Sequence, residues 1–196
     1  MKTAQHAGAL AELLAYPDER YFTYLADCRM ALAESPESLQ CLDRFAHEVE
    51  GMTIEGLQEL YTHTFDLNPI CSLEFGWQLF GENYSRGEFL VEMRQTLRRL
   101  DVPESTELPD HITHVMAAFS RMEAAEAGRF AGMCLLPALE KMLQGLSGKE
   151  CPYTAALEAI RAVIGVAAPT TNGGDRPRPF TMALPVVDPS TEVCHG

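Results

Sequence analysis

The chain contains no run of apolar residues that approaches the ~20 needed for a helix to cross a bilayer. Its first residues, MKTAQH, lack the continuous apolar core of a secretory signal peptide. Nucleotide-binding glycine motifs and the serine-nucleophile motif of hydrolases are missing as well. These absences predict a soluble, cytoplasmic protein that does not insert directly into a membrane and carries none of these catalytic motifs.

Basic side chains are also few. The 196 residues include 15 Lys and Arg against 28 Asp and Glu, which gives a net charge of −13. A negative field of this size repels nucleic-acid phosphates and anionic lipids, and it attracts basic partners. The composition therefore predicts no binding to nucleic acid and favours a basic protein or peptide as the partner.

Six cysteines are present, but none belongs to a C-x-x-C pair or to a spacing typical of a zinc site. Because 46% of the residues are hydrophobic, the chain can build a core without disulfides or metals. Without a signal sequence, reduced structural thiols are expected rather than a disulfide framework. The cysteines are Cys28, Cys41, Cys71, Cys134, Cys151 and Cys194.

Helical periodicity runs through most of the chain. Apolar residues recur at three- and four-residue spacing, as in Leu39, Leu42 and Phe45, and the pattern continues to Val166. Glycine and proline break it at intervals typical of helix ends. The sequence predicts an all-α fold, a single-domain helical bundle of about eight or nine helices over residues 1–166.

The composition changes after Val166. Residues 167–196 are rich in proline and glycine and show no helical periodicity, which predicts a flexible or extended C-terminal tail. Within it, Phe180, Met182 and Leu184 alternate with other residues. Such a segment either lies in a groove of its own or a neighbouring molecule or stays solvated, and the composition favours a mobile tail.

Residues 71–80 alternate apolar and polar side chains, which fits a strand. Because a lone strand would have no partner in a helical chain, a short, deeply buried helix that ends at Gly81 is the better prediction. Trp77 lies in this stretch and is predicted to belong to the core. A long helix is predicted next, over residues 84–100.

A further helix is predicted to begin after Leu108-Pro109, since proline disfavours helical conformation in the residue before it. This helix covers residues 110–127, with Asp110 accepting hydrogen bonds from the free amides of its first turn. Another helix is predicted over residues 128–146.

Two histidines of the same helix, His111 and His114, could share a metal ion, but the sequence offers no obvious third ligand. We therefore expect no metal site, no cofactor and no enzymatic activity. A metal- or thiol-dependent enzyme on a helical bundle, using His111, His114 and a cysteine, is the alternative. A helical adaptor unrelated to cofactor assembly is a third possibility.

Tyr61, Phe65 and Asp66 end an amphipathic helix just before a proline break, where side chains can line a groove. They belong to the first of three stretches, residues 61–66 (YTHTFD), 79–87 (LFGENYSRG) and 107–111 (ELPDH), which follow an opening LLAYP at residues 13–17. In these four pieces and their order, the chain resembles the NarJ branch of the TorD/DmsD/NarJ family of redox-enzyme maturation chaperones. The resemblance covers residues 13–166, with Phe80 where histidine is commoner.

This resemblance implies a fold and a function. The fold would be all-α, and the function would be that of a system-specific assembly chaperone for a molybdoenzyme, respiratory nitrate reductase or a related enzyme. Such a chaperone binds the N-terminal segment of the apo catalytic subunit and supports molybdenum cofactor insertion before membrane attachment or export. Homodimer formation stays open. The residues expected to bind the peptide are Tyr61, Phe65, Asp66, Leu108, Asp110 and His111.

Overall fold

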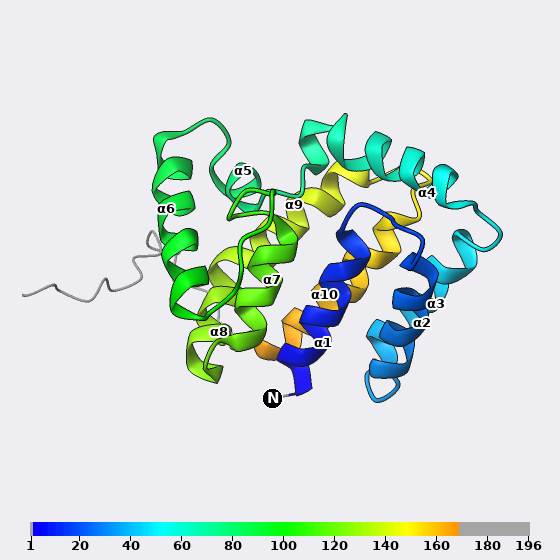
Figure 1. Ribbon diagram of the computed structural model, residues 1–196, viewed down its shortest axis with the longest axis horizontal. Helices are drawn as coiled ribbons and strands as arrows, with labels where there is room; N and C mark the ends of the chain where they lie inside the picture. Colours follow the sequence, from blue (N-terminus) through cyan, green and yellow to red (C-terminus); the bar gives the residue numbers. More distant parts are fainter. Residues whose placement is uncertain (1, 169–196) are drawn as a thin grey trace, which may run out of the picture.

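The computed structural model describes residues 2–168 (Figure 1). Within this part of the chain every regular element is a helix, and the only β-type pairing is one isolated bridge. The predicted all-α class is confirmed. The expected tail, residues 167–196, lies almost entirely outside the described residues. None of the described helices is long and apolar enough to cross a membrane.

The α-helices share modest lengths and are joined by short connections. In chain order they are α1 (Lys2–Ala11), α2 (Tyr21–Ala31), α3 (Pro36–Glu48), α4 (Ile54–Tyr61), α5 (Phe75–Phe80), α6 (Tyr84–Arg99), α7 (Ile112–Arg121), α8 (Ala124–Phe130), α9 (Leu136–Leu146) and α10 (Tyr153–Ala167). Two π-helical turns, Thr62–Asp66 and Ala131–Leu135, continue α4 and α8, and short 3-10 turns cover Glu12–Leu14 and Pro69–Cys71.

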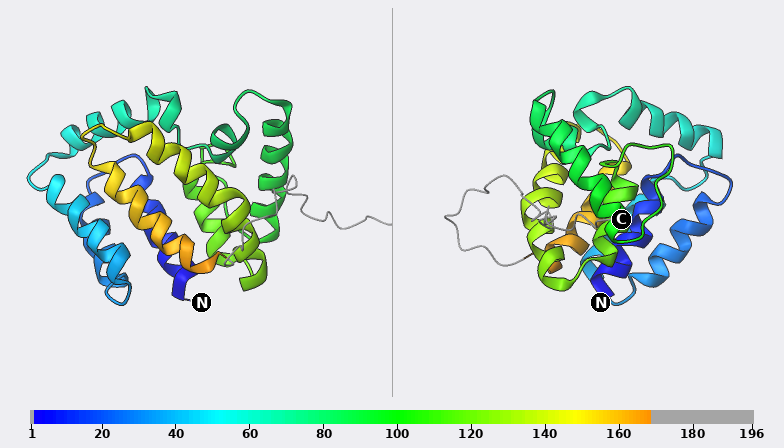
Figure 2. Two further views of the ribbon diagram at one scale, coloured as in Figure 1. Left: turned by 180° about the vertical axis from the view of Figure 1, so that it is seen from behind. Right: turned by 60° about the vertical axis from the view of Figure 1, so that its left-hand side comes forward.

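Helix α10 lies at the centre of the bundle. It packs against α1, α3 and α9, and α1 in turn packs against α7. Figure 1 shows α1 in front of α10, with α2 and α3 on one side and α6 to α8 on the other; the reverse view in Figure 2 shows α9 beside α10. The central position follows from its sequence, because Leu157, Ile160 and Ile164 are buried together with several small residues.

Several helix ends form as the sequence predicts. The short helix predicted within residues 71–80 is confined to α5 at residues 75–80, because Glu74 is extended and pairs in the isolated bridge. As predicted, the helix stops at Gly81, in a positive-φ conformation (φ 59°) that glycine adopts without strain. Helix α6, at residues 84–99, matches the helix predicted over residues 84–100 to within one residue. Thr53 begins α4, and its hydroxyl oxygen accepts a hydrogen bond from the Gly56 amide at 3.2 Å.

The helix predicted over residues 110–127 is wrong at both ends. Helix α7 begins at Ile112 with His111, not Asp110, at the capping position, and it ends at Arg121. Met122 adopts an extended conformation (ψ 149°), so α8 begins separately at Ala124, inside the predicted range. Because Met122 stays buried, the apolar pattern continues across the break and does not reveal it. The helix predicted from residue 128 begins earlier, at Ala124, and continues to Leu146 through the π-helical turn.

Candidate functional site

A cleft of about 540 Å³ opens between the end of α4, the segment before α5, α6 and the segment before α7. Its walls combine two kinds of side chain. Aromatic rings come from Tyr16, Tyr61, Phe65 and Trp77, and charged or titratable groups come from Asp66, Glu74, Arg86, Glu107 and His111. A concave site with an apolar wall and a few converging polar groups is typical of a binding site.

The aromatic wall is rigid because its rings pack edge to face. The Tyr61 ring lies 5.1 Å from that of Phe65 and 5.4 Å from that of Tyr16, measured between centroids. Phe65 also contacts Tyr153 at the start of α10, at 4.8 Å. Tyr61 and Phe65 are almost fully buried and offer only part of their surface to the cleft, whereas Tyr16 is 55% exposed at its rim.

Two chain segments pair at the floor of the cleft through the isolated antiparallel bridge between Glu74 and His111. The Phe75 amide donates to the Asp110 carbonyl at 2.9 Å, and the Ile112 amide donates to the Leu73 carbonyl at 3.0 Å. The bridge holds the ELPDH segment against the residues that precede α5, and it places the side chains of Glu74 and His111 in the same cleft.

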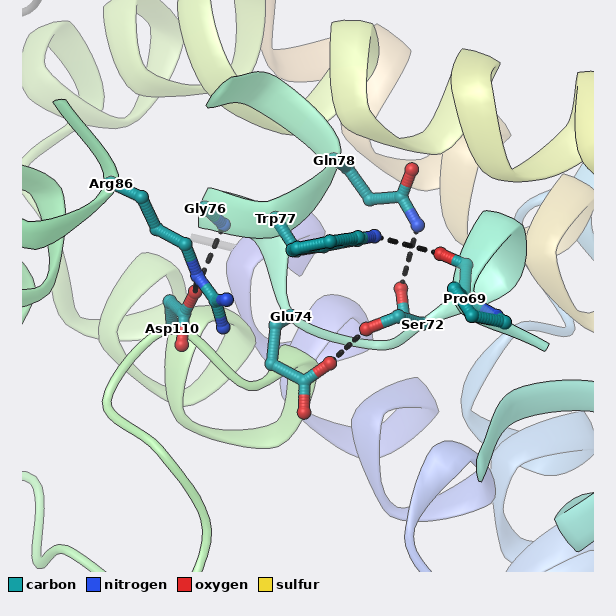
Figure 3. A network of polar contacts seen from close by, with 8 residues as sticks. All are labelled: Pro69, Ser72, Glu74, Gly76, Trp77, Gln78, Arg86 and Asp110. Atoms are coloured by element: carbon teal, nitrogen blue, oxygen red, sulfur yellow. Dashed lines mark hydrogen bonds and ion pairs between the residues drawn. The ribbon is translucent and has the colours of Figure 1, made fainter. Parts of the chain in front are cut away.

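Asp110 is fully buried behind this floor (Figure 3). Its Oδ2 atom accepts a hydrogen bond from the Gly76 amide at 3.1 Å and lies 3.9 Å from Nε of Arg86. Burial raises the pKa of the Asp110 carboxyl, and Arg86 opposes that shift. The predicted role of Asp110 as the cap of α7 is therefore wrong, because its carboxylate serves the first turn of α5 instead.

Gly76 permits this contact. A Cβ atom at position 76 would lie 2.6 Å from Oδ2 of Asp110 and 3.0 Å from Cδ1 of Phe89, distances that no side chain tolerates without displacement. The close approach of α5 to the ELPDH segment thus depends on glycine at this position.

Trp77 is not a core residue, contrary to the sequence prediction. Its ring is only partly buried and lines the cleft, its Nε1 donates to the Pro69 carbonyl at 2.8 Å, and the Arg86 guanidinium lies 5.4 Å from the ring centroid (Figure 3). Sequence reasoning also missed Glu74 and Glu107 as cleft residues. Arg86 and Glu107 lie within the stretches that carry the family resemblance, and that signal could have identified them.

The charged groups of the cleft are predominantly acidic. Arg86 is paired with Asp110, and among the described residues no ion pair forms at Asp66, Glu74 or Glu107. Burial raises the pKa of the Tyr61 hydroxyl, and these three carboxylates raise it further. The three carboxylates therefore place negative charge beside the aromatic wall, in the same cleft.

His111 is the remaining titratable group of the cleft. It is 5% exposed, and burial lowers the pKa of its imidazole, an effect that Glu107 and Glu74 oppose. Its Nδ1 atom lies 2.8 Å from the Thr113 hydroxyl at the start of α7. The ring is therefore held in place and contributes a neutral polar surface near neutral pH.

Residues 31–147 match the family model described as the nitrate reductase delta subunit. The chain belongs to this family. It is also 27% identical over 160 residues, 80% of this chain and 86% of the relative, to the "Probable nitrate reductase molybdenum cofactor assembly chaperone NarJ" of Bacillus subtilis (strain 168). The resemblance to the NarJ branch is confirmed. Apart from Tyr16, every residue that lines the cleft falls within the matched region.

Most of the residues expected to bind a peptide come together. Tyr61, Phe65, Asp66 and His111 line the cleft, although they lie up to fifty residues apart in the sequence. Asp110 lies directly behind them. Leu108 lies outside the lining and is 43% exposed on the surface. The backbone carbonyl of Leu108, rather than its side chain, forms a hydrogen bond with the ring of His114.

That contact bears on the alternative of a metal-dependent enzyme. Nδ1 of His114 lies 2.8 Å from the Leu108 carbonyl, and Nε2 accepts from the Ser105 amide at 2.9 Å, so neither ring nitrogen is available to a metal. Among the described residues, no group of three or more His, Cys, Asp or Glu side chains could hold a metal ion. His114 fixes the backbone of residues 105–108 instead.

Three of the cysteines are structural core residues. Cys28, Cys71 and Cys134 are buried, and burial raises the pKa of each to about 12. A thiol with such a pKa carries almost no thiolate near neutral pH and is a poor nucleophile. Cys194 lies outside the described residues.

Proposed function

We propose that this chain is an assembly chaperone for respiratory nitrate reductase or a related molybdoenzyme, and that its cleft binds the N-terminal segment of the apo catalytic subunit. Family membership and the name of the Bacillus subtilis relative support the general role. The observation that supports peptide binding is the cleft itself, where an aromatic wall meets three carboxylates that form no ion pair among the described residues.

An amphipathic, basic peptide fits these surfaces. Its apolar side would pack on the aromatic wall and on exposed apolar side chains near it, namely Tyr16, Leu67 and Ile70, which are 55%, 67% and 61% exposed. Its Lys or Arg side chains would approach Asp66 and Glu74, where the low dielectric of a cleft strengthens the attraction. The net charge of −13 would increase the rate of encounter with such a peptide.

Binding would take place in the cytoplasm and would protect the N-terminal segment while the molybdenum cofactor is inserted, before membrane attachment or export. The chaperone would itself hold no cofactor and catalyse no step.

Titration calorimetry with the N-terminal peptide of the catalytic subunit tests this function. We expect a micromolar or tighter dissociation constant, about −8 kcal/mol or better. The affinity should fall as the salt concentration rises, since part of it is electrostatic. A peptide of the same composition in scrambled order serves as the control. Absence of binding at low salt, or equal binding of the scrambled peptide, would contradict the proposal.

A further inference from the structure

The acidic, aromatic cleft is matched by a segment of the chain's own C-terminal region. Residues 169–196 contain only two basic Lys or Arg side chains, Arg176 and Arg178, and both fall within the sequence RPRPF, which ends at Phe180. We propose that this segment, residues 176–180, binds in the cleft of the same molecule when no client is present. The inference rests on the cleft of the proposed function and adds a regulatory contact at that site.

Chemical complementarity supports this occupant. Guanidinium groups form charge-assisted hydrogen bonds with carboxylates and stack on aromatic rings, and the cleft offers Asp66, Glu74 and Glu107 beside Trp77. The Phe180 ring adds an apolar group for the aromatic wall. Proline after each arginine restricts that arginine to extended conformations, so the segment loses less conformational entropy on binding than an ordinary linear peptide.

Chain length permits the contact within one molecule. The described chain leaves the bundle at the C-terminal end of α10, and the N-terminal end of that helix lies behind the aromatic wall of the cleft, where Tyr153 contacts Phe65 at 4.8 Å. A helix of 15 residues is about 22 Å long. Residues 169–178 can extend to about 35 Å. The two arginines are therefore placed late enough in the sequence to reach the cleft even by an indirect path.

Such a contact would compete with the client. A segment that occupies the cleft nine-tenths of the time leaves one-tenth of the molecules free to bind and weakens the apparent client affinity about tenfold. Only clients that bind strongly would then displace it. The chain would thereby discriminate against weakly bound basic peptides while it has no client.

Trp77 provides a direct readout because it is the only tryptophan of the chain and lines the cleft. We would compare its fluorescence and its quenching by acrylamide in the full chain and in a chain that ends at Ala168, without any client. The truncated chain should show stronger quenching, and a synthetic peptide of residues 174–184 should reverse the change. Circular dichroism verifies that the truncated chain keeps its helices.

A full-length variant makes the test independent of truncation. Arg176→Gln/Arg178→Gln should show the same increase in quenching as the truncated chain and should bind the client more tightly. The control, Arg29→Gln/Arg161→Gln, removes the same charge from exposed ion pairs on α2 and α10, away from the cleft, and should behave as the unchanged protein.

Equal quenching in the full chain, the truncated chain and the double variant would overturn the proposal. Failure of client binding alone would count against the proposed function and leave this measurement intact, since no client is present in it. A change in quenching that depends on protein concentration would assign the contact to a neighbouring molecule and would likewise overturn binding within one chain.

Discussion

Nε of Arg86 lies 3.9 Å from Oδ2 of Asp110, a carboxylate with no exposed surface. Arg86 belongs to α6 and Asp110 precedes α7, so the pair joins two of the stretches that carry the family resemblance. The same oxygen accepts the Gly76 amide at the start of α5. One buried carboxylate therefore connects three segments around the cleft, and its loss should affect the fold before it affects binding.

Replacement of Asp110 tests this connection. In Asp110→Ala the Gly76 amide would lose its acceptor and the partly buried Arg86 its ion-pair partner, which should reduce the free energy of unfolding by about 3 kcal/mol. In Asp110→Asn the amide oxygen can still accept from Gly76, and the loss should be about 1 kcal/mol. Urea denaturation of both variants measures the difference. Equal stability of Asp110→Ala and the unchanged protein would show that the carboxylate does not stabilise the three segments.

Two glycines offer a paired test of packing. A Cβ at Gly76 would collide with Asp110 and Phe89, so Gly76→Ala should cost about 2 kcal/mol through overpacking. Gly87 lies inside α6 with no atom within 4 Å of a Cβ, so Gly87→Ala should add up to about 1 kcal/mol by favouring the helix. Thermal melting should move in opposite directions for the two variants. Similar shifts in both would refute the close approach at Gly76.

The carboxylates of the cleft should contribute to client affinity. Glu74→Gln and Glu107→Gln each remove one negative charge from the cleft without removing volume, and each should weaken client binding roughly threefold at low salt. Glu50→Gln is the control, since Glu50 is 79% exposed just beyond the end of α3 and far from the lining. Calorimetry at two salt concentrations should show that the difference shrinks as salt rises. An equal effect of all three substitutions would assign the attraction to net charge alone.

The pH dependence of stability should report on His111. Burial lowers its pKa from the usual 6.5, so the unfolded chain binds more protons than the folded chain as the pH falls below that value. The stability that neutral His111 contributes is present above about pH 6.5 and is lost as the pH falls through the folded pKa. His111→Gln should therefore lose less stability than the unchanged protein over this range. Asp110 titrates in both proteins, with the opposite shift, so the difference between them isolates His111.

The sequence predicts the helical fold well because apolar periodicity and the residues that begin and end helices are local signals. Gly81 stops α5 and Thr53 starts α4 through the contacts of their own backbone and side chain. The roles of Asp110 and Trp77 depend instead on residues distant in the sequence. Nothing near Asp110 shows that its carboxylate meets Gly76, thirty-four positions earlier, rather than the helix that follows it. Such contacts depend on tertiary packing, and local sequence patterns carry no information about it.

The residues of the cleft were likewise predictable where a local motif marks them, but not where only a tertiary contact places them there. Tyr61, Phe65 and His111 were identified through short motifs, since each motif marks a segment. Leu108 was included because it shares a motif with His111, but residues 108–111 form a turn, in which the His111 amide donates to the Leu108 carbonyl and Leu108 stays 43% exposed. Glu74 lies in the cleft because its segment pairs with His111 in the isolated bridge, and only the fold reveals this pairing.

Photo-crosslinking tests client binding in the cleft most directly. A client N-terminal peptide with a photoreactive phenylalanine analogue would be bound to the full chain, irradiated and mapped by mass spectrometry. Crosslinks should concentrate on the aromatic wall and its rim, at Tyr16, Phe65 and Trp77, and an excess of unlabelled peptide should abolish them. Specific crosslinks confined to other faces of the bundle, with none in the cleft, would contradict the assignment of this site.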